Sequence, residues 1–375
     1  MLSYNLSNQD TKKLKELNEL ITQKLVFLDF LNIECKEYIH KMAKISTLGS
    51  STRIENAILT NTEINWLNET LNGDSKTTSY LDKSTFIKKK LSKDKERSIQ
   101  EVAGLRNVLE IIFSQAKDIF PLSEYHLRGL HSELLQYHPP ASYYLGNYKT
   151  IPNNVVERLD GKIVSEVLKT ADPGPITVSA MNDLFTWYNN EIKEQPWALT
   201  VLVEFIFRFL AIHPFQDGNG RLSRALFILG CLQNTDKNLS TIIRFISVDR
   251  QIEKTKSEYY YILRKCSEGK FKQNPKEYKI ELLLRYYIKM FEQAVLSDID
   301  FYNEKFIKLQ KLTESQLKIY NTFNDNPEIN LSTNDIQKAT GIPRRTIIHT
   351  INILLEQSFI QKLGIGPQTK YKITF

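Results

Sequence analysis

The residues best suited to chemistry lie in one short run, residues 213–224, which reads HPFQDGNGRLSR. Within this run, Gly218 and Gly220 flank Asn219. Because glycine takes positive φ at little cost, the backbone there can point several amide N–H groups toward one place. Successive N–H groups arranged in this way form a nest that binds anions. We therefore expect an anion-binding turn at residues 218–220.

Two arginines extend this turn. Arg221 and Arg224 are three residues apart, so they share one face of a helix that begins at the turn. Cations at a helix N-terminus oppose the helix dipole by about 0.3–1 kcal/mol each, so a negative group such as a polyphosphate should lie beside them. Asp217 precedes the turn and needs a divalent cation between its carboxylate and a phosphate. Mg²⁺ is commonly held by one carboxylate and by phosphate oxygens, so the pattern predicts a Mg²⁺-nucleotide with Asp217 as the metal ligand.

His213 lies four residues before Asp217 and is a candidate general base. Its ordinary pKa is near 6.5, so it can take a proton from an attacking hydroxyl group. Plainer interpretations also exist, because a histidine beside an apolar helix is often a hydrogen-bonded core residue and Asp-Gly-Asn-Gly is an ordinary turn. A calcium-binding EF-hand loop is excluded, because its twelfth position should be Glu and is Ile228 here.

Two apolar stretches must hold this run in place. Residues 201–212 are almost wholly apolar and long enough for a buried helix, which Pro214 would help to end. Residues 221–232 again have the pattern of an apolar helix. The polar run is therefore expected to be a helix–loop–helix joint in the core of the molecule.

The run resembles the signature of the Fic family, His-x-Phe-x-Asp/Glu-Gly-Asn-Gly-Arg-x-x-Arg, at every defined position. The resemblance implies a helical Fic core that transfers AMP from ATP to a Tyr, Thr or Ser hydroxyl of a target protein, or of the enzyme itself, and releases pyrophosphate. The related Doc toxins, which are kinases, carry Lys in place of Gly220, so Gly220 favours AMP transfer. The resemblance implies that His213 is the base, Asp217 the Mg²⁺ ligand, Gly218, Asn219 and Gly220 the phosphate cradle, Arg221 the contact to the triphosphate, and Arg224 the contact to the γ-phosphate.

A second stretch resembles the inhibitory motif of autoregulated Fic proteins, Ser/Thr-x-x-x-Glu-Gly/Asn, with Ser51, Glu55 and Asn56 on the defined positions. Without the downstream signature, it would be a plain helix start with acidic residues in its first turn. The resemblance implies that Glu55 pairs with Arg224, takes the place of the γ-phosphate and holds the enzyme inactive. In some family members the same Glu also supports removal of AMP from the target, and that alternative stays open.

Residues 146–156 are polar and β-prone, with turn residues at 152–154, and are expected to form a small hairpin. In Fic proteins a hairpin flap at this place pairs with the backbone of the target protein as an added strand. The plain alternative is a surface loop. The resemblance assigns target docking to Tyr148, Lys149, Thr150 and Ile151.

A group of three tyrosines, residues 259–261, resembles the tyrosines that lie near the adenine in the family. Tyr260 is the residue assigned to nucleotide binding, against the alternative of ordinary helix packing. The family often has Asn seven residues after the second tyrosine, where this chain has Ser267.

The composition agrees with a mainly α-helical protein, because 14 Gly and 12 Pro are few for 375 residues. No apolar stretch is long enough for a membrane span, and the N-terminus has no basic-then-apolar signal, so we expect no membrane partner and a cytoplasmic location. The net charge of +7 permits nucleic-acid contact without requiring it. Three scattered cysteines are too few for a disulfide framework or a zinc site: Cys35, Cys231 and Cys266.

Three consecutive regions are expected: an N-terminal helical region with the inhibitory motif (1–97), a Fic catalytic core (98–300) and a C-terminal domain (301–375). The polar, lysine-rich residues 74–97 should connect the first two. The last region has a helix-turn-helix pattern, with helices at 313–323, 332–340 and 343–357, and its tail alternates apolar and polar residues around a glycine turn. It resembles a winged-helix domain.

A winged helix reads DNA bases from the start of its second motif helix, and residues 311–375 hold eight Lys/Arg against only five Asp/Glu. Winged helices also serve in dimerisation and protein docking, so DNA, a protein partner and a homodimer are all alternatives. The expected function is a protein adenylyltransferase. Its rivals are a DNA-binding regulator whose Fic core senses nucleotide, and a Fic enzyme that transfers UMP or phosphate. The residues placed to contact DNA are Arg344, Arg345, Thr346 and His349.

Overall fold

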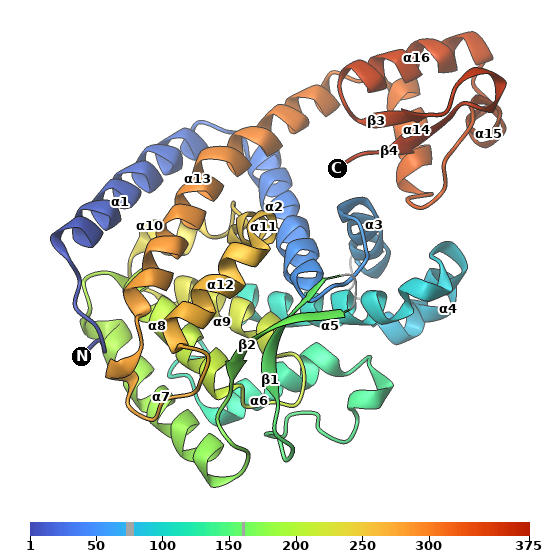
Figure 1. The fold of residues 1–375 in the computed structure, drawn as a ribbon. Coiled ribbons are helices and arrows are strands. Elements are labelled where there is room, and N and C mark those ends of the chain that lie inside the picture. The colour runs from blue at the N-terminus through green and yellow to red at the C-terminus, as the bar shows by residue number, and fades with distance from the viewer. Residues whose placement is uncertain (73–78, 160–161) are drawn as a thin grey trace. The chain divides into compact units, whose positions relative to one another are not determined.

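A computed structural model describes residues 1–72, 79–159 and 162–375 (Figure 1). It is mainly helical and contains two small antiparallel two-stranded sheets, as the sequence predicted. By its contacts the chain divides into two compact units, Met1–Ala57 with Arg97–Ile299 and Ile58–Glu96 with Asp300–Phe375. Within the described ranges, no helix is long and apolar enough to cross a membrane.

The first unit consists of helices and one hairpin, with the first part of helix α13 (Ile280–Gln310) included. Short 3₁₀ turns lie at Pro139–Ala141 and Pro275–Glu277. The helices are α1 (Asn8–Asp29), α2 (Ile33–Ile54), α5 (Glu96–Gln115), α6 (Glu124–Leu135), α7 (Pro175–Glu194), α8 (Ala198–Ile212), α9 (Asn219–Gln233), α10 (Lys237–Ile242), α11 (Val248–Lys254) and α12 (Lys256–Ser267), and the strands are β1 (Asn154–Leu159) and β2 (Lys162–Lys169).

Helix α8 forms the centre of this unit. All its residues except Arg208 are buried, because the run is apolar on every side and has no face suited to water. It packs against α7 and α9, and α9 also contacts α2 and α6 (Figure 1). The one buried acid of α8, Glu204, accepts hydrogen bonds from the Ser3 N–H at 3.0 Å and from Arg208 at 3.3 Å, as a buried charge requires.

The helix–loop–helix joint is confirmed. Helix α8 ends at Ile212, His213 takes the left-handed conformation with φ 53°, and Pro214 cannot continue the helix because it lacks an N–H. Gly218 then adopts φ 82° as the N-cap of α9. The polar run therefore lies between two buried helices, as the two apolar stretches predicted.

The position predicted for the hairpin at 146–156 is wrong. The strands pair Asn154 with Lys169 and Leu159 with Lys162, so the hairpin begins where the predicted one should end. Tyr148 instead makes an isolated bridge to Phe215. The physical reason is that the β-branched residues of 155–156 and 163–167 form a better pair of strands than the polar residues before them.

The close approach of α5 to α6 predicts a stability effect. A Cβ atom added at Gly104 would lie 2.0 Å from the carbonyl oxygen of Leu134, which is backbone and cannot move aside. We expect Gly104→Ala to lower the free energy of unfolding by about 1–3 kcal/mol, the usual range for overpacking. Gly129→Ala in α6 is the matched control, since it meets nothing within 4 Å and should stabilise by up to about 1 kcal/mol through helix propensity. Urea unfolding midpoints measure both, and equal midpoints would contradict the prediction.

The second unit combines two helices from early in the chain with the C-terminal region. Helices α14 to α16 and the hairpin lie where the sequence predicted them, and Leu331 bridges to Tyr371 of β4. An apolar cluster that includes Ile336, Ile351 and Phe359 forms its core. The elements are α3 (Asn61–Leu71), α4 (Tyr80–Lys90), α14 (Glu314–Asn324), α15 (Thr333–Thr340), α16 (Arg344–Glu356), β3 (Ile360–Leu363) and β4 (Lys370–Ile373), with 3₁₀ turns at Lys93–Lys95 and Gly366–Gln368.

This division differs from the three consecutive regions that the sequence suggested. Of the expected connection at 74–97, residues 74–78 lie outside the described residues, and most of the remainder belongs to the second unit. Lys95 joins it there through ion pairs of 2.8 Å to Glu63 and 2.8 Å to Glu328. Long-range pairs of this kind leave no trace in local sequence, so the segment looked like a solvated connection.

Candidate active site

His213 lies at the end of α8, and its side chain is set up as a proton acceptor. Its backbone N–H donates to the Phe209 carbonyl at 2.8 Å, and its ring Nδ1 lies 3.3 Å from the Leu210 carbonyl. A carbonyl can only accept, so Nδ1 carries the proton and Nε2 keeps its lone pair. Burial, with a further contribution from the positive charge of Lys149, lowers the pKa of His213 to about 4. The imidazole is therefore neutral at pH 7.

The turn after His213 is held by its own polar groups. The Asn219 side chain accepts from the Phe215 N–H at 3.0 Å and donates to the Phe215 carbonyl at 2.7 Å, and it is only 1% exposed. The amide of Asn219 thus closes the loop, so any part of this residue in a phosphate cradle falls to its backbone. His131 supports the loop from α6, since its ring stacks on Phe215 at 3.8 Å and Nε2 faces the Asp217 carbonyl at 3.0 Å.

The structure gives a different reason for glycine at position 220 from the one that the sequence suggested. It lies inside α9, and only Gly218 of the two glycines has positive φ. A Cβ atom at Gly220 would lie 2.1 Å from Oε1 of Glu55. The missing side chain at position 220 therefore makes room for the Glu55 carboxylate.

Arg221 is a buried cation with unused hydrogen-bonding groups. Its side chain is 2% exposed, with Nη2 3.4 Å from Asp217 Oδ1 and Nη1 3.6 Å from Glu101 Oε1. Within the described part of the chain, Nε and Nη1 make no hydrogen bond. Leaving such donors unpaired is costly, so the arrangement suits an anionic acceptor such as a phosphate. Sequence analysis missed Glu101, which is the one buried acid of α5.

Asp217 fits the part of a Mg²⁺ ligand. Its side chain is 34% exposed at the cavity, and Oδ1 accepts from the Gly218 N–H at 2.6 Å. Burial alone would raise the pKa of Asp217. Arg221 and the Gly218 N–H nevertheless hold this pKa below its usual range, so the carboxylate is charged. The described residues contain no cluster of three or more metal-ligating side chains. One carboxylate fits a Mg²⁺ whose other ligands are phosphate oxygens and water.

The segment that resembles an inhibitory motif contacts Arg224 directly. Glu55 is the C-cap of α2, so the alternative of a helix start at this place is wrong. Glu55 Oε1 accepts from Arg224 Nη2 at 2.9 Å, and Ser51 accepts from the same guanidinium through its hydroxyl at 2.8 Å and its carbonyl at 2.7 Å. Asn56 turns the chain with φ 72° and accepts from Lys256 at 2.9 Å. Arg224 thus donates three hydrogen bonds to one segment, residues 51–55.

Helix α11 packs against α2 and pairs with it, which sequence analysis did not foresee. Arg53 forms a bidentate pair with Glu253 at 2.6 and 3.0 Å. Buried Asp249 lies near Arg224, and burial raises the pKa of this carboxyl to about 6. No local signal could have found the Arg53–Glu253 pair, because 200 residues separate its partners.

One cavity of about 300 Å³ brings the predicted residues together. It is lined by Glu55, His213, Asp217, Arg221, Arg224 and Tyr260, among others. Tyr260 belongs to α12 and is 6% exposed, with its ring 5.6 Å from that of Tyr259. Ser267, where the family often has Asn, is buried and donates to the Leu263 carbonyl at 3.0 Å.

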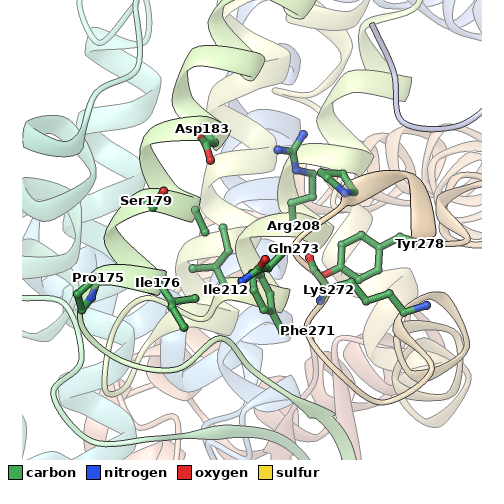
Figure 2. Close-up of a pocket in the computed structure, with 12 residues that line it drawn as sticks. Pro175, Ile176, Ser179, Asp183, Arg208, Ile212, Phe271, Lys272, Gln273 and Tyr278 are labelled. Carbon is green, nitrogen blue, oxygen red and sulfur yellow. Dashed lines mark hydrogen bonds between the residues drawn. The ribbon is translucent and has the colours of Figure 1, made fainter.

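A larger hollow of about 540 Å³ lies between α7, α8 and the loop after α12 (Figure 2). Its two cations are already paired, Arg208 with Glu204 and Lys272 with Glu268. None of the residues assigned to chemistry lines it. We therefore place the candidate active site in the smaller cavity.

The four residues assigned to target docking do not act together. The Tyr148 ring packs against that of Phe215 at a tilt, with ring centroids 5.4 Å apart, and Lys149 is buried. Ile151, in contrast, is 63% exposed, and Thr150 is also exposed. The Lys149 side chain is therefore not available to a partner protein, and its backbone N–H already donates to the Pro214 carbonyl at 2.7 Å. Residues 154–156 of β1 line the cavity instead. The missed sequence signal is an Asp-Gly dipeptide between two β-branched runs, which favours a hairpin.

Comparison with known proteins gives the following matches. Residues 121–230 match the model of the Fic/DOC family. The chain is similar to a Fic family protein from Desulfovibrio desulfuricans, with 19% identity and TM-score 0.56 over 100% of this chain and 98% of that one. It is also similar to a Fic-domain signalling protein from Bacteroides thetaiotaomicron, with 21% identity and TM-score 0.55 over 77% of this chain and 96% of that one. A third similar structure is Fic-1 from C. elegans, with 16% identity and TM-score 0.54 over 78% of this chain and 72% of that one. No curated protein matches. At these identities the likeness concerns the fold.

Proposed function

Because residues 121–230 form a Fic/DOC domain, whose family transfers nucleotide or phosphate groups to proteins, we propose that this protein moves AMP from ATP to a hydroxyl group of a target protein. The observation that carries the proposal is one cavity that combines the neutral base His213, the charged Asp217 and the buried Arg221 with its unpaired donors. Such a set can deprotonate a nucleophile next to a bound triphosphate.

In the proposed reaction, the target hydroxyl oxygen attacks the α-phosphorus of ATP. Nε2 of His213 accepts the hydroxyl proton while the new O–P bond forms. The bond from the α-phosphorus to the oxygen that bridges to the β-phosphate breaks, and its electron pair leaves with pyrophosphate. Arg221 and the N-terminal amides of α9 bind the triphosphate. Mg²⁺, held by Asp217, would neutralise charge on the departing pyrophosphate.

The Glu55–Arg224 pair supports an inhibited resting state. Glu55 occupies the guanidinium that the γ-phosphate would need, and the same carboxylate fills the space above Gly220. In this form ATP cannot engage Arg224. The proposal is therefore an adenylyltransferase restrained by its own N-terminal helix.

The test uses ATP labelled at different phosphates, with the Glu55→Gly protein. Label from the α-phosphate should enter protein, whereas label from the γ-phosphate should leave with pyrophosphate. Transfer from the γ-position would instead identify a kinase, and transfer from α-labelled UTP a UMP transferase. Absence of transfer from all three would overturn the proposal of an enzyme.

The pKa of His213 predicts the pH dependence. A base whose pKa is lowered to about 4 is unprotonated over the whole neutral range and loses its function only when the pH falls through that value. The kcat/KM for Mg²⁺-ATP reports groups of the free enzyme, so in the Glu55→Gly protein it should be flat from about pH 8 to about pH 5.5, because the acid limb lies well below the ordinary histidine pKa of about 6.5. Enzyme incubated at each pH and assayed at neutral pH controls for unfolding. Half-maximal kcat/KM near pH 6.5 would contradict the prediction.

A second candidate function, DNA binding, rests on the start of α16. Arg345, Thr346 and His349 are exposed there, whereas Arg344 donates to Asn334 at 2.6 Å. Filter binding to mixed duplex DNA at two salt concentrations tests this candidate. Affinity that falls steeply with salt would support phosphate contacts, and affinity indifferent to salt would count against them. Tight binding without AMP transfer would favour a regulator over an enzyme.

A further inference from the structure

Lys149 is a buried lysine beside the candidate base. Its side chain is 3% exposed, and Nζ donates to Asn153 Oδ1 at 2.9 Å, to Thr170 Oγ1 at 2.9 Å and to the Ile212 carbonyl at 3.0 Å. An ammonium group has three N–H donors, so these contacts use all of them. Lys149 is thus committed to the interior of the protein.

The three acceptors belong to three different segments. Asn153 precedes β1, Thr170 follows β2, and Ile212 is the last residue of α8. Asn153 also donates from its amide to the Phe215 carbonyl at 2.7 Å, and the Thr170 hydroxyl contacts the Asn153 carbonyl at 2.6 Å. Lys149 therefore joins both ends of the hairpin to the loop that carries His213.

Lys149 also holds the backbone on both sides of His213. Its Nζ binds the Ile212 carbonyl, and its backbone N–H donates to the Pro214 carbonyl at 2.7 Å. His213 has φ 53°, in the left-handed region that is unfavourable for a residue with a side chain. Hydrogen bonds to the peptide groups before and after the residue oppose its relaxation to an ordinary conformation.

The positive charge of Lys149 also favours a neutral His213 side chain. An ammonium at the C-terminus of α8 interacts favourably with the helix dipole. After burial, Lys149 is the largest influence that lowers the pKa of His213, whereas Glu55 and Asp217 act in the opposite sense. The charge thus helps to keep the imidazole unprotonated.

We propose that Lys149 is a positioning residue of this site, which fixes the backbone around His213 and ties the base of the hairpin to it. This inference rests on the proposed function, because the value of a fixed His213 lies in proton transfer from the target hydroxyl. It replaces the docking role that the sequence suggested for Lys149.

The test compares Lys149→Met with Lys305→Met in the Glu55→Gly protein. Lys305 is a half-buried lysine of the second unit, and burial lowers its pKa to about 8, as it does for Lys149. We expect Lys149→Met to lower kcat about tenfold while KM for ATP stays within about twofold, since small misplacements of reacting groups reduce the chemical step. Lys305→Met should change neither constant. Unchanged kcat in Lys149→Met would overturn the proposal.

A second variant separates position from charge. Thr170→Val removes one acceptor and keeps the ammonium, so it should lower kcat by a smaller factor without moving the acid limb, whereas Lys149→Met should move the acid limb to higher pH. If Lys149→Met fails to fold, Thr170→Val carries the test through its effect on kcat against KM. A loss of kcat matched by an equal rise in KM for ATP, with the acid limb unmoved, would show a merely structural role and overturn the proposal.

A direct titration keeps this inference distinct from the proposed function. NMR of the histidine rings without Mg²⁺, assigned with His213→Ala, reports the pKa of His213 whether or not AMP is transferred. It should rise in Lys149→Met and stay unchanged in Lys305→Met. If the Glu55→Gly protein transfers nothing, the proposed function fails while this titration still decides the role of Lys149, and an unchanged pKa in both variants would overturn it.

Discussion

Under the proposed function, replacing His213 with alanine in the Glu55→Gly protein should lower the rate of AMP transfer about 10²- to 10⁴-fold, the usual contribution of a general base. The imidazole lines the same cavity as Asp217 and Arg221, and its pKa of about 4 leaves it free to accept a proton at neutral pH. The initial rate of label incorporation from α-labelled ATP measures the effect. Affinity for ATP should stay within about twofold, because the loss concerns the chemical step alone.

The control for this variant is His126→Ala. His126 is a half-buried histidine at the start of α6, where Nδ1 lies 3.1 Å from the hydroxyl of Ser123, and it does not line the cavity. Its removal should leave the transfer rate unchanged. A His213→Ala protein that keeps more than about a tenth of the parent rate would show that His213 is not the base.

Under the proposed function, replacing Glu55 with glycine should raise AMP transfer about 10- to 30-fold. A charge-assisted hydrogen bond contributes about 1.5–3 kcal/mol, and each 1.4 kcal/mol is about a factor of ten. The Glu55 side chain is 32% exposed, so screening by solvent places the effect near the lower end of that range. Self-modification in the presence of α-labelled ATP provides the measurement before a target protein is known.

Glu268→Gly is the matched control for Glu55→Gly. Glu268 is also the C-cap of a helix, and its carboxylate is paired with Lys272 and Lys279 at 2.9 Å each. The same exchange at that position should leave transfer unchanged. Equal rates in the wild-type and Glu55→Gly proteins would show that the Arg224 contact does not restrain the reaction.

The sequence predicted the central part of the fold well, because that part is encoded locally. The apolar run before His213 has no polar face, so it could only be a buried helix, and Pro214 and Gly218 mark its end and the start of the next. The chemical residues of the 213–224 run line one cavity because a single short loop between α8 and α9, with the first turn of α9, carries them all. The Glu55–Arg224 contact was predicted only through a family resemblance, since 169 residues separate the two side chains.

The remainder depended on long-range packing. The hairpin begins later in the chain than the polar turn residues at 152–154 indicate, because the β-branched runs behind them form the paired strands. Lys149 was assigned to the surface, as lysines usually are, and the three acceptors that bury it come from residues 153, 170 and 212. Gly220 was explained by backbone freedom, whereas its absent side chain accommodates Glu55. Each of these depends on a partner far away in the chain.

The contacts of Ser51 with Arg224 have a consequence for regulation. Glu55 supplies one of the three hydrogen bonds on this guanidinium, and Ser51 supplies the other two. If the Glu55 side chain turns away, Ser51 can still hold Arg224 in place, so opening the site would need no displacement of α2. Because a single side chain competes with a single nucleotide, the open fraction would rise hyperbolically with nucleotide concentration and would show no threshold. Under the proposed function, the rate of transfer would therefore follow the ATP concentration continuously.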